Sequence, residues 1–126
     1  MLTRSPMKRT RPKPTIPAAL RRQLEARSGG WCEARLLFCT GRATDTAHRN
    51  GQKMGGRPGD KPRLSNVLHL CRACHGWCHN RPAEAKDLGL MLEEWQDPAG
   101  EPVAYQSNGF VLLDDAGGLW PWGDAA

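Results

Sequence analysis

The segment "LCRACHGWCHNRP", residues 70–82, gathers three cysteines and two histidines close together. Its C-x2-C pair, Cys71 and Cys74, has the spacing that lets two sulfurs reach one tetrahedral ion from a single turn. A looser C-x6-C pair, Cys32 and Cys39, lies upstream, and the loop "EARLLF" between them would bring its sulfurs together. Two close pairs are the usual layout of a four-thiolate zinc site. The sequence therefore predicts that these four cysteines bind a structural Zn2+ ion.

Other chemistries fit parts of this pattern. The four cysteines could be buried free thiols, and "CRACH" matches the C-x-x-C-H attachment pattern of c-type haem. Haem is attached after export, the N-terminal sequence lacks the apolar segment of a secretory signal, and haem would leave Cys32 and Cys39 unexplained. The fifth cysteine, Cys78, argues against a closed disulfide set and is interpreted as a free, non-ligating thiol.

The length and composition favour one small cytoplasmic domain. The chain has 126 residues, and its 14 glycines and 10 prolines imply that much of it is loop. No apolar stretch is long enough to span a membrane. Without a secretory signal, the protein is expected in a reducing cytoplasm, where disulfides are disfavoured.

Charge is unevenly distributed along the chain. Residues 1–27 contain eight Lys or Arg and one acid, whereas residues 93–126 contain seven acids and no Lys or Arg. A basic front attracts the phosphate backbone of nucleic acid, although a solubilising tail has the same composition. We therefore predict a basic, disordered tail at 1–14, a central domain at 15–92 and an acidic C-terminal extension at 93–126.

Capping residues and apolar spacing predict the first helix. The segment "TIPAALRRQLEARSGG" has Thr15 as a plausible N-cap and ends at a glycine pair. Ile16, Leu20 and Leu24 fall on one helical face. Such a face would pack against the rest of the domain.

Strands and shorter helices are predicted further along the chain. Strands are indicated at "RATDTAH" (42–48) and "NVLHLC" (66–71), with a long Gly- and Arg-rich loop between them. A helix around Cys74 is interrupted at Pro82 and resumes for another turn or two. The segments "EPVAYQ" and "NGFVLLDD" could pair as a hairpin, and residues 116–126 are interpreted as a tail.

The strings "CEARLLFCTGRATDTAHRN", "KMGG" and "LSNVLHLCRACHGWCHNRPAEAKDLG" together resemble the HNH endonuclease family, especially its small phage and actinobacterial members. The resemblance covers roughly residues 27–92, and its signature residues would be His48, Asn66 and His75. It implies a small α+β fold: a ββα-metal finger stapled by a structural zinc, with an N-terminal helix and a C-terminal β-hairpin. It also implies a metal-dependent enzyme that hydrolyses phosphodiester bonds of double-stranded DNA.

The residues suit that chemistry. His48 could take a proton from water as general base, and Asn66 could hold the hairpin and orient it. His75 and His79, four residues apart on a helix, could hold one catalytic ion: Mg2+, Mn2+, Ni2+ or Zn2+. The side chains predicted to contact the DNA backbone are Arg49, Lys53, Arg57, Lys61 and Arg63. Since backbone contacts carry no sequence information, low sequence specificity is expected.

One position departs from the family pattern. Many relatives have a metal ligand immediately before the general-base histidine, and here that residue is Ala47. The ion could rest on His75 and His79 with phosphate and water, Asp45 could substitute from the same strand face, or Ala47 could be an inactivating change. The last interpretation makes the chain a zinc-stabilised DNA-binding module without catalysis. For phage members, the resemblance further implies work beside terminase or portal components, in the cytoplasm of an infected bacterial cell.

Overall fold

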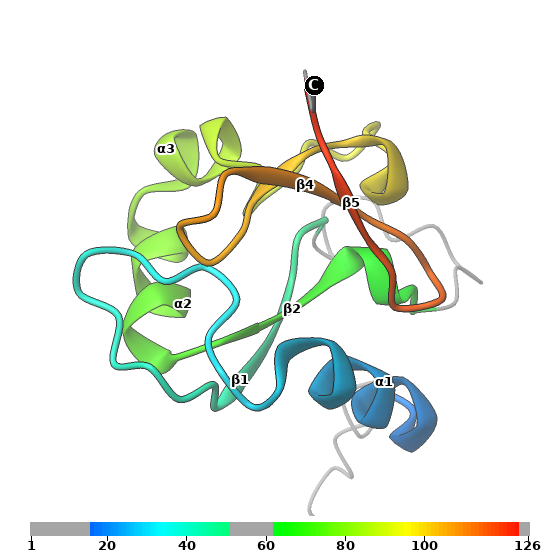
Figure 1. Ribbon diagram of the computed structural model, residues 1–126. Coiled ribbons are helices and arrows are strands. Elements are labelled where there is room, and N and C mark those ends of the chain that lie inside the picture. The colour runs from blue at the N-terminus through cyan, green and yellow to red at the C-terminus, as the bar shows by residue number, and fades with distance from the viewer. Residues whose placement is uncertain (1–15, 51–61, 124–126) are drawn as a thin grey trace, which may run out of the picture.

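The computed structural model describes residues 16–50 and 62–123, and this part of the chain is a small α+β structure with three α-helices and two small antiparallel sheets (Figure 1). The helices are α1 (Ala18–Ser28), α2 (Arg72–Asn80) and α3 (Pro82–Asp87). The strands are β1 (Asp45–His48), β2 (Val67–Leu70), β3 (Val103–Ala104), β4 (Phe110–Leu113) and β5 (Leu119–Pro121), and two 3-10 turns are η1 (Leu64–Asn66) and η2 (Pro98–Gly100). The predicted α+β class is confirmed.

Helix α1 forms where its sequence signals predicted it. It starts after Pro17 and ends at Gly29, whose φ of 66° is the left-handed conformation that glycine adopts without strain. The predicted cap Thr15 lies outside the described residues. Its apolar face packs on the start of β2, and the cluster consists of Ile16, Leu20, Leu24, Leu64 and Val67. The predicted helix and its buried face are confirmed.

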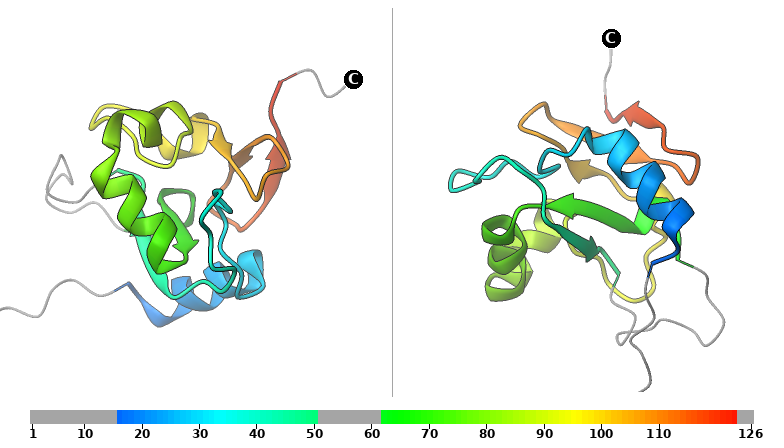
Figure 2. Two further views of the ribbon diagram at one scale, coloured as in Figure 1. Left: turned by 90° about the vertical axis from the view of Figure 1, so that its left-hand side faces the viewer. Right: turned by 90° about the horizontal axis from the view of Figure 1, so that it is seen from below.

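Strands β1 and β2 pair antiparallel, with Asp45 opposite Leu70 and His48 opposite Val67. Helix α2 follows β2 directly, and Cys71 caps it by accepting a hydrogen bond from the backbone N–H of Cys74. Proline at the first position of α3 separates the two helices. Figure 1 and the left view of Figure 2 show α1 below the β1–β2 pair and the second sheet above it. Both predicted strands and the interrupted helix are confirmed.

The second sheet has the order β3-β4-β5. Its first two strands form the predicted hairpin, with Val103 opposite Val111. The interpretation of residues 116–126 as a tail is wrong for 119–121, since β5 pairs with β4. The carboxylate of Asp114 accepts hydrogen bonds from the backbone N–H groups of Ala116 and Gly118, which closes the turn between these strands. The Gly- and Pro-rich sequence suggested an irregular tail, whereas these hydrogen bonds stabilise a turn that leads into β5.

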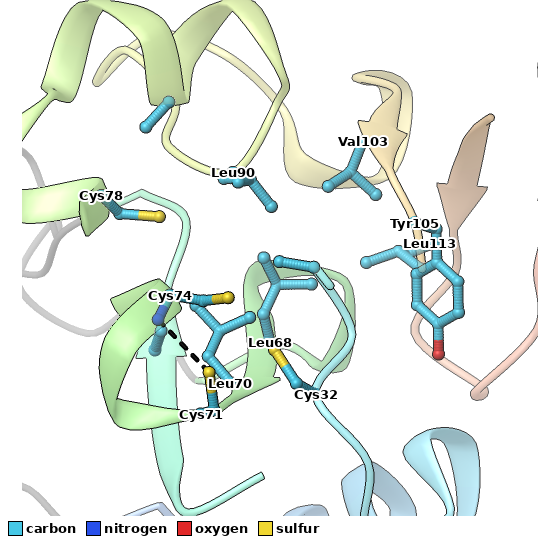
Figure 3. Packing of buried hydrophobic residues seen from close by; sticks show 13 residues of the cluster. Cys32, Leu68, Leu70, Cys71, Cys74, Cys78, Leu90, Val103, Tyr105 and Leu113 are labelled. Atoms are coloured by element: carbon cyan, nitrogen blue, oxygen red, sulfur yellow. Dashed lines mark hydrogen bonds between the residues drawn. The ribbon is translucent and has the colours of Figure 1, made fainter. Parts of the chain in front are cut away.

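One buried core joins both sheets with α2 and α3 (Figure 3), whereas α1 packs through its own cluster. Val103, Tyr105 and Leu113 from the C-terminal extension pack against the same cluster as Leu70 and Leu90. The acidic extension is therefore built into the fold rather than appended to it. No helix within residues 16–50 and 62–123 has the length and apolarity needed to cross a membrane.

A buried ion pair joins α1 to the segment between Cys32 and Cys39. The Arg27 guanidinium donates to both carboxylate oxygens of Glu33, at 2.7 and 2.9 Å. Glu33 also accepts from Tyr105 Oη and from the backbone N–H of His69. Since buried charges are costly unless paired and hydrogen-bonded, this network specifies where α1, β2 and the extension meet.

Candidate functional site: a four-cysteine cluster and a histidine pair

The four predicted cysteines converge on one point. The sulfurs of Cys32, Cys39, Cys71 and Cys74 all lie within 4.8 Å of one another, and the group could hold a metal ion. The Sγ atoms of Cys71 and Cys39 are 3.8 Å apart. Zn–S bonds of about 2.3 Å in a tetrahedron separate neighbouring sulfurs by about 3.8 Å. The spacing therefore suits zinc.

Local backbone geometry prepares these sulfurs as ligands. The N–H groups of Gly41 and Cys74 donate to the sulfurs of Cys39 and Cys71, each at 3.3 Å. Burial raises the pKa of Cys71, but hydrogen bonds from the backbone of Thr40 and Cys74 more than offset it, and the pKa falls to about 6. A thiol with this pKa is largely a thiolate at neutral pH, which is the form that binds metal. Burial raises the pKa of Cys39 and Cys74, so a bound metal ion would have to displace their protons.

The fifth cysteine lies outside this group. Cys78 is buried on α2 among apolar neighbours, and Figure 3 shows it apart from Cys71 and Cys32. Burial raises its pKa to about 11, so it is a neutral thiol at pH 7. Its place agrees with the interpretation of a non-ligating thiol.

A second cluster of polar groups lies where β1 faces α2. His75 Nδ1 is 2.9 Å from a carboxylate oxygen of Asp45, and His75 Nε2 is 3.1 Å from His79 Nε2. The contact with His75 is the main reason that the pKa of Asp45 falls to about 2. The predicted pairing of His75 with His79 is present, and Asp45 joins it from the strand.

In this structure the carboxylate of Asp45 contacts His75, and its possible role as a metal ligand stays a prediction. Its carboxylate lies against Nδ1 of His75, whereas the two Nε2 atoms face each other at hydrogen-bond distance. Metal–nitrogen bonds of about 2.0–2.1 Å separate neighbouring nitrogens by about 3–3.4 Å, which includes the observed 3.1 Å. A carboxylate on the far nitrogen fixes the ring and its tautomer. Asp45 therefore orients His75, and Ala47, buried in the core, offers no ligand.

His48 lies at the end of β1, and its position is electrostatically unusual. Its Nε2 is buried without a hydrogen-bond partner among the described residues. Burial lowers the pKa of His48, and the charge of nearby His75 lowers it further. A neutral imidazole with an unpartnered nitrogen can accept a proton.

Asn66 closes the base of the loop that joins β1 to β2. Its Oδ1 accepts from the backbone N–H of Asn50, and its Nδ2 donates to the Asn50 carbonyl. Asn50 in turn donates to three carbonyls, those of residues 93, 94 and 96. Asn66 thus holds the chain two residues beyond His48, and acts on its position through the backbone.

The prediction that Arg49 contacts DNA is wrong. Arg49 is fully buried, and its guanidinium donates to the backbone carbonyls of Ser65, Gly89, Pro98 and Glu101. Burial lowers its pKa to about 10, so it remains protonated at pH 7. Strand alternation could have revealed this, because Arg49 shares the inward face of Ala47.

Of the four other residues predicted to contact DNA, the structure describes only Arg63. Arg63 is exposed but bonded to Asp97 and Asp115, at 2.8 and 2.9 Å. Lys53, Arg57 and Lys61 lie outside the described residues.

Replacing Arg49 with Met should destabilise the protein severely. Each buried carbonyl left without a donor costs about 1–3 kcal/mol, and four carbonyls depend on this side chain. Urea unfolding monitored by circular dichroism measures the loss. Arg81→Met is the matched control, because Arg81 is 65% exposed in its pair with Glu84 and should change stability by less than about 1 kcal/mol. Equal stability of the two variants would show that the Arg49 network is dispensable.

Comparison with known proteins adds no relative: no family model matches the chain, and no curated protein or solved structure is significantly similar to it.

Proposed function

We propose that this protein is a metal-dependent DNA endonuclease of the HNH type, in which β1, β2 and α2 form a ββα-metal finger. The observation that carries the proposal is the chain of contacts Asp45–His75–His79, which joins β1 to α2. Strand β1 ends at His48, whose Nε2 has no hydrogen-bond partner within residues 16–50 and 62–123. A potential metal pair and a neutral base on adjoining elements are the parts that phosphodiester hydrolysis needs. The order of residues agrees with the family resemblance.

Each side chain has a distinct part in this proposal. His48 Nε2 accepts the proton of the attacking water, since burial keeps the imidazole neutral. His75 and His79 present their Nε2 atoms to a divalent ion, which would stabilise charge on the scissile phosphate and the leaving oxygen. Asp45 would hold His75 in the tautomer whose Nε2 carries the lone pair, on the side that faces His79. Asn66 fixes the loop that leaves β1.

The four-cysteine cluster would hold zinc with a structural role. All four positions of a tetrahedron are filled by protein sulfurs, so no position is open for substrate. The ion would join the loop after α1 to the start of α2, and so set the direction in which the α2 histidines point.

The proposed substrate is double-stranded DNA, bound with low sequence specificity. The chain has a formal net charge of +5, and residues 51–61 contain three Lys or Arg. Contacts to phosphates from such residues would position the backbone without reading bases. A role beside phage terminase or portal components belongs to this proposal through the resemblance alone.

Supercoiled plasmid provides the direct test. We expect conversion to nicked or linear DNA when Mg2+, Mn2+, Ni2+ or Zn2+ is supplied, and none in excess EDTA. Since the proposed ion rests on two protein nitrogens, activity should need metal in the millimolar range. Plasmid that stays supercoiled across the whole metal panel would contradict the proposal.

The second candidate is a zinc-stabilised DNA-binding module without catalysis. It is favoured by Ala47, which is buried in the core at the position where relatives carry a metal ligand. Such a module would retard DNA in a gel and leave it uncut with every metal. Binding and cleavage measured on the same samples distinguish the two functions.

A further inference from the structure

The outer face of the second sheet is aromatic and exposed. Phe110 pairs with Trp122 and Leu112 with Trp120, so these four side chains lie on one face, opposite the face of Val103 and Leu113 that enters the core. Trp120 is 58% exposed, Trp122 53% and Phe110 39%. Exposed apolar patches of this kind mark interaction sites. We call these four residues the aromatic face.

The indole at its centre is held in place. Trp120 Nε1 donates to the Asp114 carboxylate at 2.7 Å, and the same carboxylate is fixed by the turn that follows it. A Cβ at position 118 would collide with this carboxylate, so Gly118 permits the contact. An exposed tryptophan with a fixed ring binds a partner at low cost in conformational entropy.

Charge indicates which partner suits this face. The segment that carries this face, residues 93–126, contains seven acids and no Lys or Arg. Arg63 already pairs with Asp97 and Asp115, and Lys86 with Glu93, so the remaining acids provide the excess charge. This excess would repel DNA and attract a basic segment. Residues 1–15 of the same chain contain five Lys or Arg, three prolines and no acid. Proline-rich segments dock on aromatic surfaces, and Arg and Lys stack on indole rings.

The position of α1 allows this segment to reach the face. Ile16 packs with Leu64, and a Cβ at Gly117, in the turn between β4 and β5, would lie 3.6 Å from Leu64 Cδ2. Ile16, the first described residue, therefore lies near the turn of the hairpin that carries Trp120. Fifteen extended residues span at most about 50 Å, well above the radius of gyration of about 13 Å for a domain of 100 residues.

We propose that residues 1–15 dock on the aromatic face of their own chain. The segment that would attract DNA is then held by the acidic end of the molecule until a stronger polyanion competes for it. This inference needs no nuclease activity, so it stands or falls separately from the proposed function.

The test compares two full-length proteins labelled with 15N in their tryptophan indoles. In the first, Arg4, Lys8, Arg9, Arg11 and Lys13 are all replaced with Ser. In the second, Arg21 and Arg22, exposed on α1, are replaced with Ser as the matched control. Single Trp→Phe variants assign the five indole signals.

We expect the Trp120 and Trp122 signals of the first protein to differ in chemical shift from those of the parent. The signal of Trp77, which lies on α2 and packs beside Phe38, should stay unchanged. The control should shift neither. Tenfold dilution of the parent should leave its spectrum unchanged, because the contact is within one chain. Unmoved Trp120 and Trp122 signals would overturn the proposal, and so would signals that change on dilution, which would assign the face to a second copy.

Discussion

Replacing Cys71 with Ser should leave the protein unfolded. Cys71 contributes one of the four clustered sulfurs and also caps α2. Zinc bound to four thiolates contributes about 10–16 kcal/mol of apparent binding energy in small domains, whereas whole domains are stable by only about 5–15 kcal/mol. Loss of one ligand therefore removes stability comparable to the total. Circular dichroism should show loss of structure, and metal analysis of the parent should find about one zinc per chain.

Cys78→Ser is the matched control for this prediction. Cys78 is as buried as the ligands and lies on the same helix, yet it is outside the cluster. A hydroxyl without a partner there costs about 1–3 kcal/mol, so the variant should fold and keep its zinc. A Cys71→Ser protein that is folded, soluble and free of zinc would refute a structural metal. So would an equal loss of structure in both variants.

Local signals were sufficient to predict most elements of the fold. Each of these signals determines structure within a few residues of its own position. They are the cysteine spacing, the glycine pair after α1 and the proline at the start of α3. The strand β5 was missed because its turn depends on the carboxylate of Asp114, and the sequence around it is rich in Gly and Pro. That turn is a contact between side chain and backbone, which composition does not reveal.

The site was predictable where spacing determines geometry and unpredictable where tertiary contacts do. His75 and His79 meet because they are four residues apart on one helix. Arg49 looked like a phosphate contact, but its bonds reach carbonyls 16 to 52 residues away. Asp45 was one of three alternatives for the missing ligand at Ala47, and its contact with His75 Nδ1 was not predictable from local spacing.

Replacing His48 with Ala should abolish most cleavage while the protein continues to fold and bind DNA. A lost general base lowers the rate by about 10²–10⁴-fold. Because Nε2 of His48 makes no hydrogen bond to the described residues, its removal breaks no polar contact among them. Initial rates of plasmid nicking measure the loss, and gel retardation and zinc content check that the rest is intact.

The pH dependence of the cleavage rate of the unsubstituted protein provides a second test of His48 as the general base. Burial, aided by His75, lowers the pKa of His48 below the ordinary value of 6.5. Since the base acts unprotonated, the rate should stay level as pH falls from 8 through 6.5 and decline only below that value. An acid limb centred at or above 6.5 would point to another group as the base.

Ala47 decides how a negative result is interpreted. Ala47→Asp places a carboxylate at the position where members of the HNH family carry a ligand. Because Ala47 is only 6% exposed, the buried charge is costly unless an ion pairs with it, so circular dichroism must first show that the variant folds. If the ion is under-coordinated, this variant should bind metal more tightly and cut faster than the parent, and Ala47→Asp combined with His48→Ala should again be slow. If the parent and Ala47→Asp are both inert with every metal while DNA binding persists, His48 is no general base. The chain is then a DNA-binding module, and its histidine pair serves structure rather than hydrolysis.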